Sequence, residues 1–365
     1  MLGSLDLTVS PPGKPMRPSS ARFICVFLGV LTAASQAAAA TSSQPVADTG
    51  TQPSAIEAQS RALQRASEAV VGVRTQAVAN ARSAATLGRD RQGSGVLIGS
   101  DGLVLTIGYL VLEAEQVELT THDGRQVPAR VVAYDLATGF GLVRALAPLR
   151  LEPAPLGDSA TVRPREALLL ASGGVQGDIG MASLASRRAF SAYWEYHLDE
   201  ALFTSPPRRD HAGAGLFNTQ GELVGVGSLM VADAAEPGAP AQAGNMFVPI
   251  ALLAPVLPEL LAQGRSSASL RAWMGLNCVE ANGEVRIVRV STDSPADVAG
   301  LEAGDRILAI DGQAVSDLAV LWKTLWAKQP AARNVQLDIR RNGQPMRVTV
   351  YAVDRAWTLR RAEGV

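Results

Sequence analysis

The sequence predicts a mainly β fold in which short strands close into barrels or pack as a sandwich. Apolar runs rich in Val and Leu are separated by turn signals such as Asp101-Gly102 and Asp123-Gly124, and Asp-Gly between alternating apolar residues is typical of β-hairpins. The chain has 34 glycines and only 5% aromatic residues, so its core must rely on Val, Leu, Ile and Ala. At 365 residues it has room for two or three domains.

The composition excludes several classes of function. Basic and acidic residues are balanced, at 33 and 34, and 47% of the residues are apolar, which indicates a globular protein without a nucleic-acid partner. The three histidines, His122, His197 and His211, are far apart and lack the spacing of a metal site. We therefore expect neither a metal nor a cofactor.

The first 40 residues predict a targeting segment. Arg22 precedes an apolar run over 23–31, and small residues follow at Ala37 to Ala40, as in a cleaved signal peptide. With the residues up to Ala34 the apolar stretch is about 12 residues long, which is shorter than the roughly 20 that cross a bilayer, so a retained anchor is only the alternative. Translation from Met16 would give a more ordinary basic region. We expect an exported, periplasmic protein whose mature chain has no membrane span.

The elements follow in order along the mature chain. Residues 41–67 predict a polar linker and a short helix, which the apolar pattern places at 56–69. A strand over 70–74 and a surface loop over 76–92 come next. The strand-and-turn texture then continues through these ranges: 93–98, 103–106, 117–120, 127–132, 167–172 and 223–229.

Residues 189–202 look irregular, with Tyr193, Trp194 and Tyr196 grouped together. A helix of Leu and Ala is predicted from Pro249 to Leu261, and a Ser-rich linker follows at 265–270.

The remainder of the chain predicts a separate compact unit over 271–353 and a tail over 354–365. Residues 294–312 give a short helix, a Gly turn, a buried strand and an Asp-Gly turn. Ser316 is a candidate N-cap for the next helix. In that helix, Leu318, Leu321 and Leu325 form a core stripe, and Trp322 lies off the stripe.

Three segments together resemble the HtrA/Deg (Do-like) family of envelope serine proteases. They are 93–106, 221–226, and 245–250 with the following 273–276. The resemblance implies a chymotrypsin/trypsin-like double β-barrel over 68–264, with one six-stranded barrel at about 68–150 and another at about 151–250. It also implies an α+β PDZ domain over 271–353.

The resemblance implies that the catalytic triad is lost. Tyr109 stands where the family has its His, Gly139 where it has its Asp, and Ala212 where it has its nucleophilic Ser. A methyl group cannot attack a carbonyl, and no imidazole is left to take a proton. Asp210 replaces the Gly that shapes the oxyanion hole, where a carboxylate would be repulsive. A relocated site using Ser205 and His211 is the alternative.

The peptide-binding surface of the family is retained in the sequence. Trp273, Met274, Gly275 and Leu276 match the carboxylate-binding loop of a PDZ domain, and Trp322 is the groove candidate on the helix. The backbone N–H groups of such a loop hold a peptide's terminal carboxylate while the peptide adds as a strand. The expected partners are C-terminal peptides or unfolded polypeptides.

Three functions remain open on the sequence. The first is a non-catalytic chaperone, adaptor or regulator in envelope protein quality control. The second is an active serine endopeptidase with a displaced site. The third is a structural subunit that forms homo-oligomers or joins active relatives. Family trimers use N-terminal aromatic residues, and 41–92 contains none.

Overall fold

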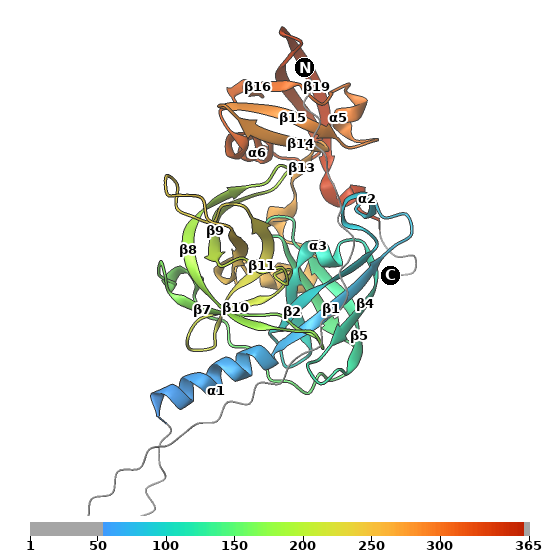
Figure 1. The fold of residues 1–365 in the computed structure, drawn as a ribbon. Helices are drawn as coiled ribbons and strands as arrows, with labels where there is room; N and C mark the ends of the chain where they lie inside the picture. Colours follow the sequence, from blue (N-terminus) through green and yellow to red (C-terminus); the bar gives the residue numbers. More distant parts are fainter. Residues whose placement is uncertain (1–53, 361–365) are drawn as a thin grey trace, which may run out of the picture. The chain divides into compact units, whose positions relative to one another are not determined.

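The computed structural model describes residues 54–360, all within one compact unit of the chain (Figure 1). The predicted signal peptide over 1–40 lies outside the described residues, as does most of the linker. Within the described part, no helix is both long enough and apolar enough to span a membrane.

The first part of the fold is a helix followed by a closed six-stranded barrel (Figure 1). Ser54 caps the helix with a complete capping box, in which its side chain accepts from Glu57 N–H and Glu57 returns the bond. The strand order is β1-β2-β3-β6-β5-β4. The elements are α1 (Ala55–Glu68), β1 (Val70–Ala77), α2 (Ala84–Leu87), β2 (Asp90–Leu97), β3 (Leu103–Ile107), α3 (Gly108–Val111), β4 (Ala114–Thr120), β5 (Gln126–Tyr134) and β6 (Phe140–Ala145).

A second closed barrel of six strands follows, in the order β10-β11-β12-β9-β8-β7. Fully buried Phe203, Phe217 and Phe247 are among the largest side chains of its interior. The elements are η1 (Ser159–Thr161), β7 (Ala167–Ala171), β8 (Ile179–Ser191), β9 (His197–Ser205), β10 (Gly215–Phe217), β11 (Leu223–Val231), β12 (Gly244–Pro249), η2 (Ile250–Leu252) and α4 (Leu257–Gln263).

The C-terminal part is a seven-stranded antiparallel sheet with two helices and a core of its own. Trp322, Leu321 and Leu325 of α6 pack into this core together with strand residues. The elements are η3 (Ser267–Ser269), β13 (Ala272–Trp273), β14 (Leu276–Ala281), β15 (Glu284–Val290), α5 (Pro295–Val298), β16 (Arg306–Ile310), β17 (Gln313–Ala314), α6 (Leu318–Trp326), β18 (Arg333–Arg341), β19 (Gln344–Asp354) and η4 (Arg355–Thr358). Two β-barrels followed by an α+β unit confirm the predicted fold class.

Local predictions differ from the structure at four places. The surface loop expected over 76–92 contains α2 and the start of β2, and Ala77, Val78 and Ala81 are buried. The helix expected over 249–261 is split into η2 and α4, because Pro255 and Pro258 cannot continue a helix, and Pro258 instead starts α4. The N-cap of α6 is Asp317, whose side chain accepts from Val320 N–H, and Ser316 only donates to Asp317. The segment 189–202 belongs to the β8–β9 hairpin and is irregular only at the tip, 192–196, and at a bulge between Arg188 and Phe190.

Buried Asp135 ties the first barrel to the segment that leads into the PDZ-like unit. One of its carboxylate oxygens accepts from the hydroxyls of Ser266 and Ser269, and the other accepts from Thr138 N at 2.9 Å and Thr138 Oγ1 at 2.6 Å. Burial by itself raises the pKa of Asp135, but these hydrogen bonds outweigh it and hold the pKa below its usual value.

We expect Asp135→Ala to lower the free energy of unfolding by about 3 kcal/mol, because it leaves several buried donors without an acceptor. Urea titration measures the change. Asp101→Ala is the control, since it removes a largely exposed carboxylate that pairs with Arg144 and accepts a long hydrogen bond from Leu103 N, and it should cost less than about 1 kcal/mol.

The charged carboxylate of Asp135 adds to the free energy of unfolding at pH values above the pKa that this group has in the unfolded chain. That contribution is lost as the pH falls below about 4. The difference in the free energy of unfolding between wild type and Asp135→Ala should therefore become smaller at acidic pH. An equal cost for Asp135→Ala and Asp101→Ala at neutral pH would contradict the role of this network.

Candidate functional site

The loop that contains Ala212 is a tight turn held between strands of both barrels. Ala214 N donates to His211 O at 3.0 Å, Gly213 N donates to Gly227 O at 2.8 Å, and Ala212 O accepts from Ser94 N at 2.8 Å. Gly213 has a φ of +71°, and a Cβ there would lie 1.9 Å from Ser94 O. Only glycine fits this position, so the backbone of the loop is fixed while the side chain of residue 212 is a methyl group.

Tyr109 lies on α3 and reaches toward the same loop. Its hydroxyl donates to Ser228 O at 2.8 Å, and Ser228 is the neighbour of Gly227, which bonds Gly213. Burial raises the pKa of Tyr109 far above its usual value. The phenol is therefore neutral at physiological pH and cannot serve as a general base.

Gly139 lies beside the start of α3, because Gly108 N donates to Gly139 O at 2.7 Å. Its φ is +83°, and a Cβ there would come within 2.9 Å of the Tyr196 hydroxyl oxygen. That hydroxyl donates to Thr138 O at 2.7 Å. The phenol of Tyr196 thus borders Gly139 and leaves little room for any side chain at this position.

These contacts bring the three positions to one region, where the two barrels meet. The methyl, the phenol and the missing side chain provide no nucleophile, no base near neutral pH and no carboxylate. What the sequence could not predict is the neighbour Tyr196, which contributes its hydroxyl from the β8–β9 hairpin.

Asp210 belongs to an ion-pair cluster. Its carboxylate accepts from Arg208 Nη2 at 2.7 Å and from Ser172 Oγ at 2.6 Å, and Arg208 also pairs with Asp178. Burial by itself raises the pKa of Asp210, but the bonds from Arg208 and Ser172 outweigh it and keep the pKa low. A fixed negative charge therefore stands beside the loop, where an oxyanion would need donors.

Ser205 and His211 have separate partners. Ser205 Oγ donates to Ala243 O and accepts from Gln242, whereas His211 Nδ1 donates to Arg208 O at 3.0 Å. His122 is exposed. The structure does not pair the two residues of the predicted relocated site.

A Ser-His-Asp chain does occur elsewhere, in the β8–β9 hairpin, and was missed from the sequence. Ser191 Oγ lies 2.8 Å from His197 Nδ1, and His197 Nε2 lies 3.3 Å from Asp199 Oδ1. Burial lowers the pKa of His197. The ring is reversed relative to a protease triad, in which Nε2 faces the serine, and Ser191 and His197 are simply cross-strand partners.

The predicted carboxylate-binding loop holds a carboxylate, and it comes from this chain. Gly275 N donates to Glu195 Oε1 at 2.7 Å, Leu276 N at 3.0 Å and Met274 N at 3.1 Å. Gly275 has a φ of +90°, which directs successive N–H groups to one point. Burial raises the pKa of Glu195 to about 7, although the three N–H groups and Arg355 act in the opposite direction.

The residues before Glu195 continue along the groove between β14 and α6. Cys278 N donates to Tyr193 O at 2.6 Å, and Trp194 forms an antiparallel bridge with Asn277. Trp322 Nε1 donates to Ala192 O at 3.1 Å. Trp322 itself is fully buried in the core, so it meets the segment through its indole N–H rather than through an open pocket.

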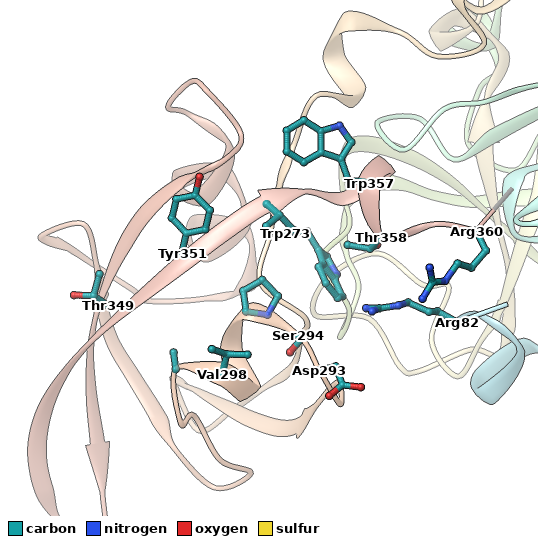
Figure 2. Close-up of a pocket in the computed structure, with 13 residues that line it drawn as sticks. Arg82, Trp273, Asp293, Ser294, Val298, Thr349, Tyr351, Trp357, Thr358 and Arg360 are labelled. Atoms are coloured by element: carbon teal, nitrogen blue, oxygen red, sulfur yellow. The ribbon is translucent and has the colours of Figure 1, made fainter. Parts of the chain in front are cut away.

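A separate cavity of about 570 Å³ is lined by Trp273 and by residues of α5, β19 and η4 (Figure 2). Of the predicted peptide-binding residues, only Trp273 lines it. Arg82 and Arg360 bring positive charge to it, and Tyr351 and Trp357 bring exposed aromatic surface. Trp273 thus borders this cavity, whereas Met274, Gly275 and Leu276 bind Glu195.

Comparison with known proteins agrees with this fold. The trypsin-like peptidase domain family matches residues 93–226, and the PDZ domain family matches residues 272–351. Similar proteins include a "Probable periplasmic serine endoprotease DegP-like" of Marinomonas sp. (strain MWYL1), 28% identical over 72% of this chain and 57% of the relative. The periplasmic pH-dependent serine endoprotease DegQ of Escherichia coli (strain K12) is 24% identical over 71% of this chain and 58% of the relative.

Solved structures show the same fold. The HtrA-type protease AlgW with a tripeptide aligns with a TM-score of 0.50 and 21% identity, over 83% of this chain and 98% of that one. The serine endoprotease from Yersinia pestis aligns with a TM-score of 0.50 and 22% identity, over 81% and 97%. The chain therefore contains a trypsin-like peptidase domain followed by a PDZ domain and is similar to proteases of the HtrA/Deg family, and it spans less than two thirds of the length of the curated relatives it matches.

We expect Gly139→Asp, which reinstates the family's carboxylate, to destabilise the protein, because residue 139 has a positive φ and its side chain would collide with Tyr196. Gly124→Asp is the matched control, since Gly124 has the same φ of +83° and nothing nearer to its Cβ than 3.7 Å. Thermal unfolding should show Gly139→Asp to be the more costly by about 1–2 kcal/mol. Equal costs would mean that Tyr196 does not restrict the site.

Proposed function

We propose that this protein is a non-catalytic member of the HtrA/Deg family that binds polypeptides. The observation that carries the first half of the proposal is the occupation of the triad positions by Tyr109, Gly139 and Ala212. Restoring Ser at position 212 would still leave no imidazole to accept its proton and no carboxylate to orient one.

The observation that supports binding is the set of N–H groups at Met274, Gly275 and Leu276, which converge on one carboxylate. A peptide with a free C-terminus and an apolar last residue would bind in the same way and pair with β14. The family relative AlgW was solved with a tripeptide. Affinity should be about micromolar, because the peptide must be ordered on binding.

The setting we propose is the periplasm, where the protein would act as a chaperone, adaptor or regulator in protein quality control. Two relatives are named periplasmic endoproteases, and the predicted signal peptide agrees with export. The protein would work as a homo-oligomer or together with active relatives. An active endopeptidase with a displaced site is the competing function, and the Ser191-His197-Asp199 chain is its specific candidate.

We expect no labelling of the purified chain by a fluorophosphonate probe and no cleavage of an unfolded protein such as casein. Ala212→Ser should be equally inert, because the base and its orienting group are absent. The readouts are in-gel fluorescence and release of soluble fragments. Labelling that disappears in Ser191→Ala or Ser205→Ala would support the competing function.

We expect peptides with a free C-terminal Val or Leu to bind, and the same peptides with a C-terminal amide to bind at least about tenfold more weakly, because the amide carries no negative charge. Isothermal titration calorimetry measures both. Equal affinity for the free and amidated forms would rule out capture of the terminal carboxylate.

A further inference from the structure

We propose that the tip of the β8–β9 hairpin, residues 192–196, is an internal ligand of the PDZ groove, and that a peptide partner binds by displacing it. The proposal rests on the peptide-binding function proposed above and adds its regulation. The Glu195 side chain stands in for the terminal carboxylate of a peptide, and the backbone of Ala192 to Trp194 stands in for the added strand.

The first argument is that the carboxylate of Glu195 and the terminal carboxylate of a peptide would need the same N–H donors. Met274, Gly275 and Leu276 each direct their N–H to the Glu195 carboxylate, at 2.7 to 3.2 Å. A backbone N–H carries one hydrogen. A C-terminal carboxylate therefore cannot take these bonds until Glu195 leaves, and binding of the two is mutually exclusive.

The second argument concerns the strand that the ligand would pair with. Tyr193 O already accepts from Cys278 N, and Trp194 bridges Asn277, both on β14. The opposite wall of the groove is engaged as well, because Trp322 Nε1 of α6 donates to Ala192 O. An incoming peptide that adds to β14 meets the hairpin tip along this length and not only at the carboxylate.

The third argument is that the internal ligand is releasable. The Tyr193 side chain is 55% exposed, and the tip is a short turn closed by Ala192 N to Tyr196 O at 3.0 Å. Complete burial raises the pKa of Glu195, so its charged form is held less favourably than it would be in water. Moving Glu195 into solvent recovers that cost and makes displacement by a peptide feasible.

The segment also indicates the chemistry of the partner. Tyr193 and Trp194 precede Glu195, and their rings lie 4.8 Å apart. Neither ring defines a side-chain pocket of the groove, because Tyr193 is 55% exposed and Trp194 packs against the barrel core and stacks on Tyr196. The segment supplies the groove with a carboxylate and an extended backbone, so the partner is a peptide with a free C-terminus presented as an extended strand.

The test compares the full chain with Glu195→Ala and with Glu200→Ala, which removes an exposed carboxylate from the same hairpin. The probe is a fluorescein-labelled octapeptide that ends in Tyr-Trp-Val with a free carboxylate. By fluorescence anisotropy, Glu195→Ala should bind it at least about tenfold more tightly than wild type, and Glu200→Ala should bind it like wild type.

A second readout needs no peptide. Amide hydrogen exchange of Met274, Gly275 and Leu276 should be slow in wild type, at least about tenfold faster in Glu195→Ala, and slow again when the octapeptide is bound. Glu195→Gln, which keeps the shape of the side chain but not its charge, should also speed up exchange at these three amides, by a smaller factor. This variant replaces Glu195→Ala in the test if the alanine variant does not fold.

The outcomes separate the two proposals. Measurable but equal affinity in wild type and Glu195→Ala would overturn the internal ligand and leave peptide binding intact. Absence of binding in every variant would contradict the proposed peptide-binding function, and the exchange rates would then decide the internal ligand on their own. Exchange rates of Met274, Gly275 and Leu276 that are the same in Glu195→Ala as in wild type would overturn the internal-ligand proposal.

Discussion

The interaction on which this structure depends is the bond between the Glu195 carboxylate and the N–H groups of the PDZ loop. Glu195 is contributed by the second barrel, and the N–H groups that donate to its carboxylate belong to the C-terminal unit. One residue further along, Tyr196 bonds Thr138 in the first barrel. A five-residue hairpin tip, 192–196, therefore contacts all three parts of the fold.

This hairpin also borders the region that contains Tyr109 and Gly139. The Tyr196 hydroxyl approaches Gly139 so closely that a carboxylate there would need both a relaxed backbone and a displaced phenol. Tyr109 is fixed by its own bond to Ser228. The hydroxyls of Tyr109 and Tyr196 are both hydrogen-bonded to backbone carbonyls, and these contacts join the two barrels.

The sequence predicted the fold class, because the motifs of 93–106 and 221–226 are local and carry their own turn glycines. It also located the PDZ loop at 273–276. It could not predict Glu195 as its ligand, since the two are about 80 residues apart in the chain and only the cluster of aromatic residues marks the hairpin. Trp322, the groove candidate, is buried in the core and still donates its indole N–H to Ala192 O. The helix expected over 249–261 is interrupted by Pro255 and Pro258.

The most direct test is a crystal structure of the full chain bound to a peptide that ends in Tyr-Trp-Val. The account predicts that the peptide carboxylate takes the N–H groups of Met274, Gly275 and Leu276, that the peptide pairs with β14, and that Glu195 has moved into solvent with the hairpin tip. A structure in which the peptide is bound while Glu195 keeps its bonds to those N–H groups would contradict it.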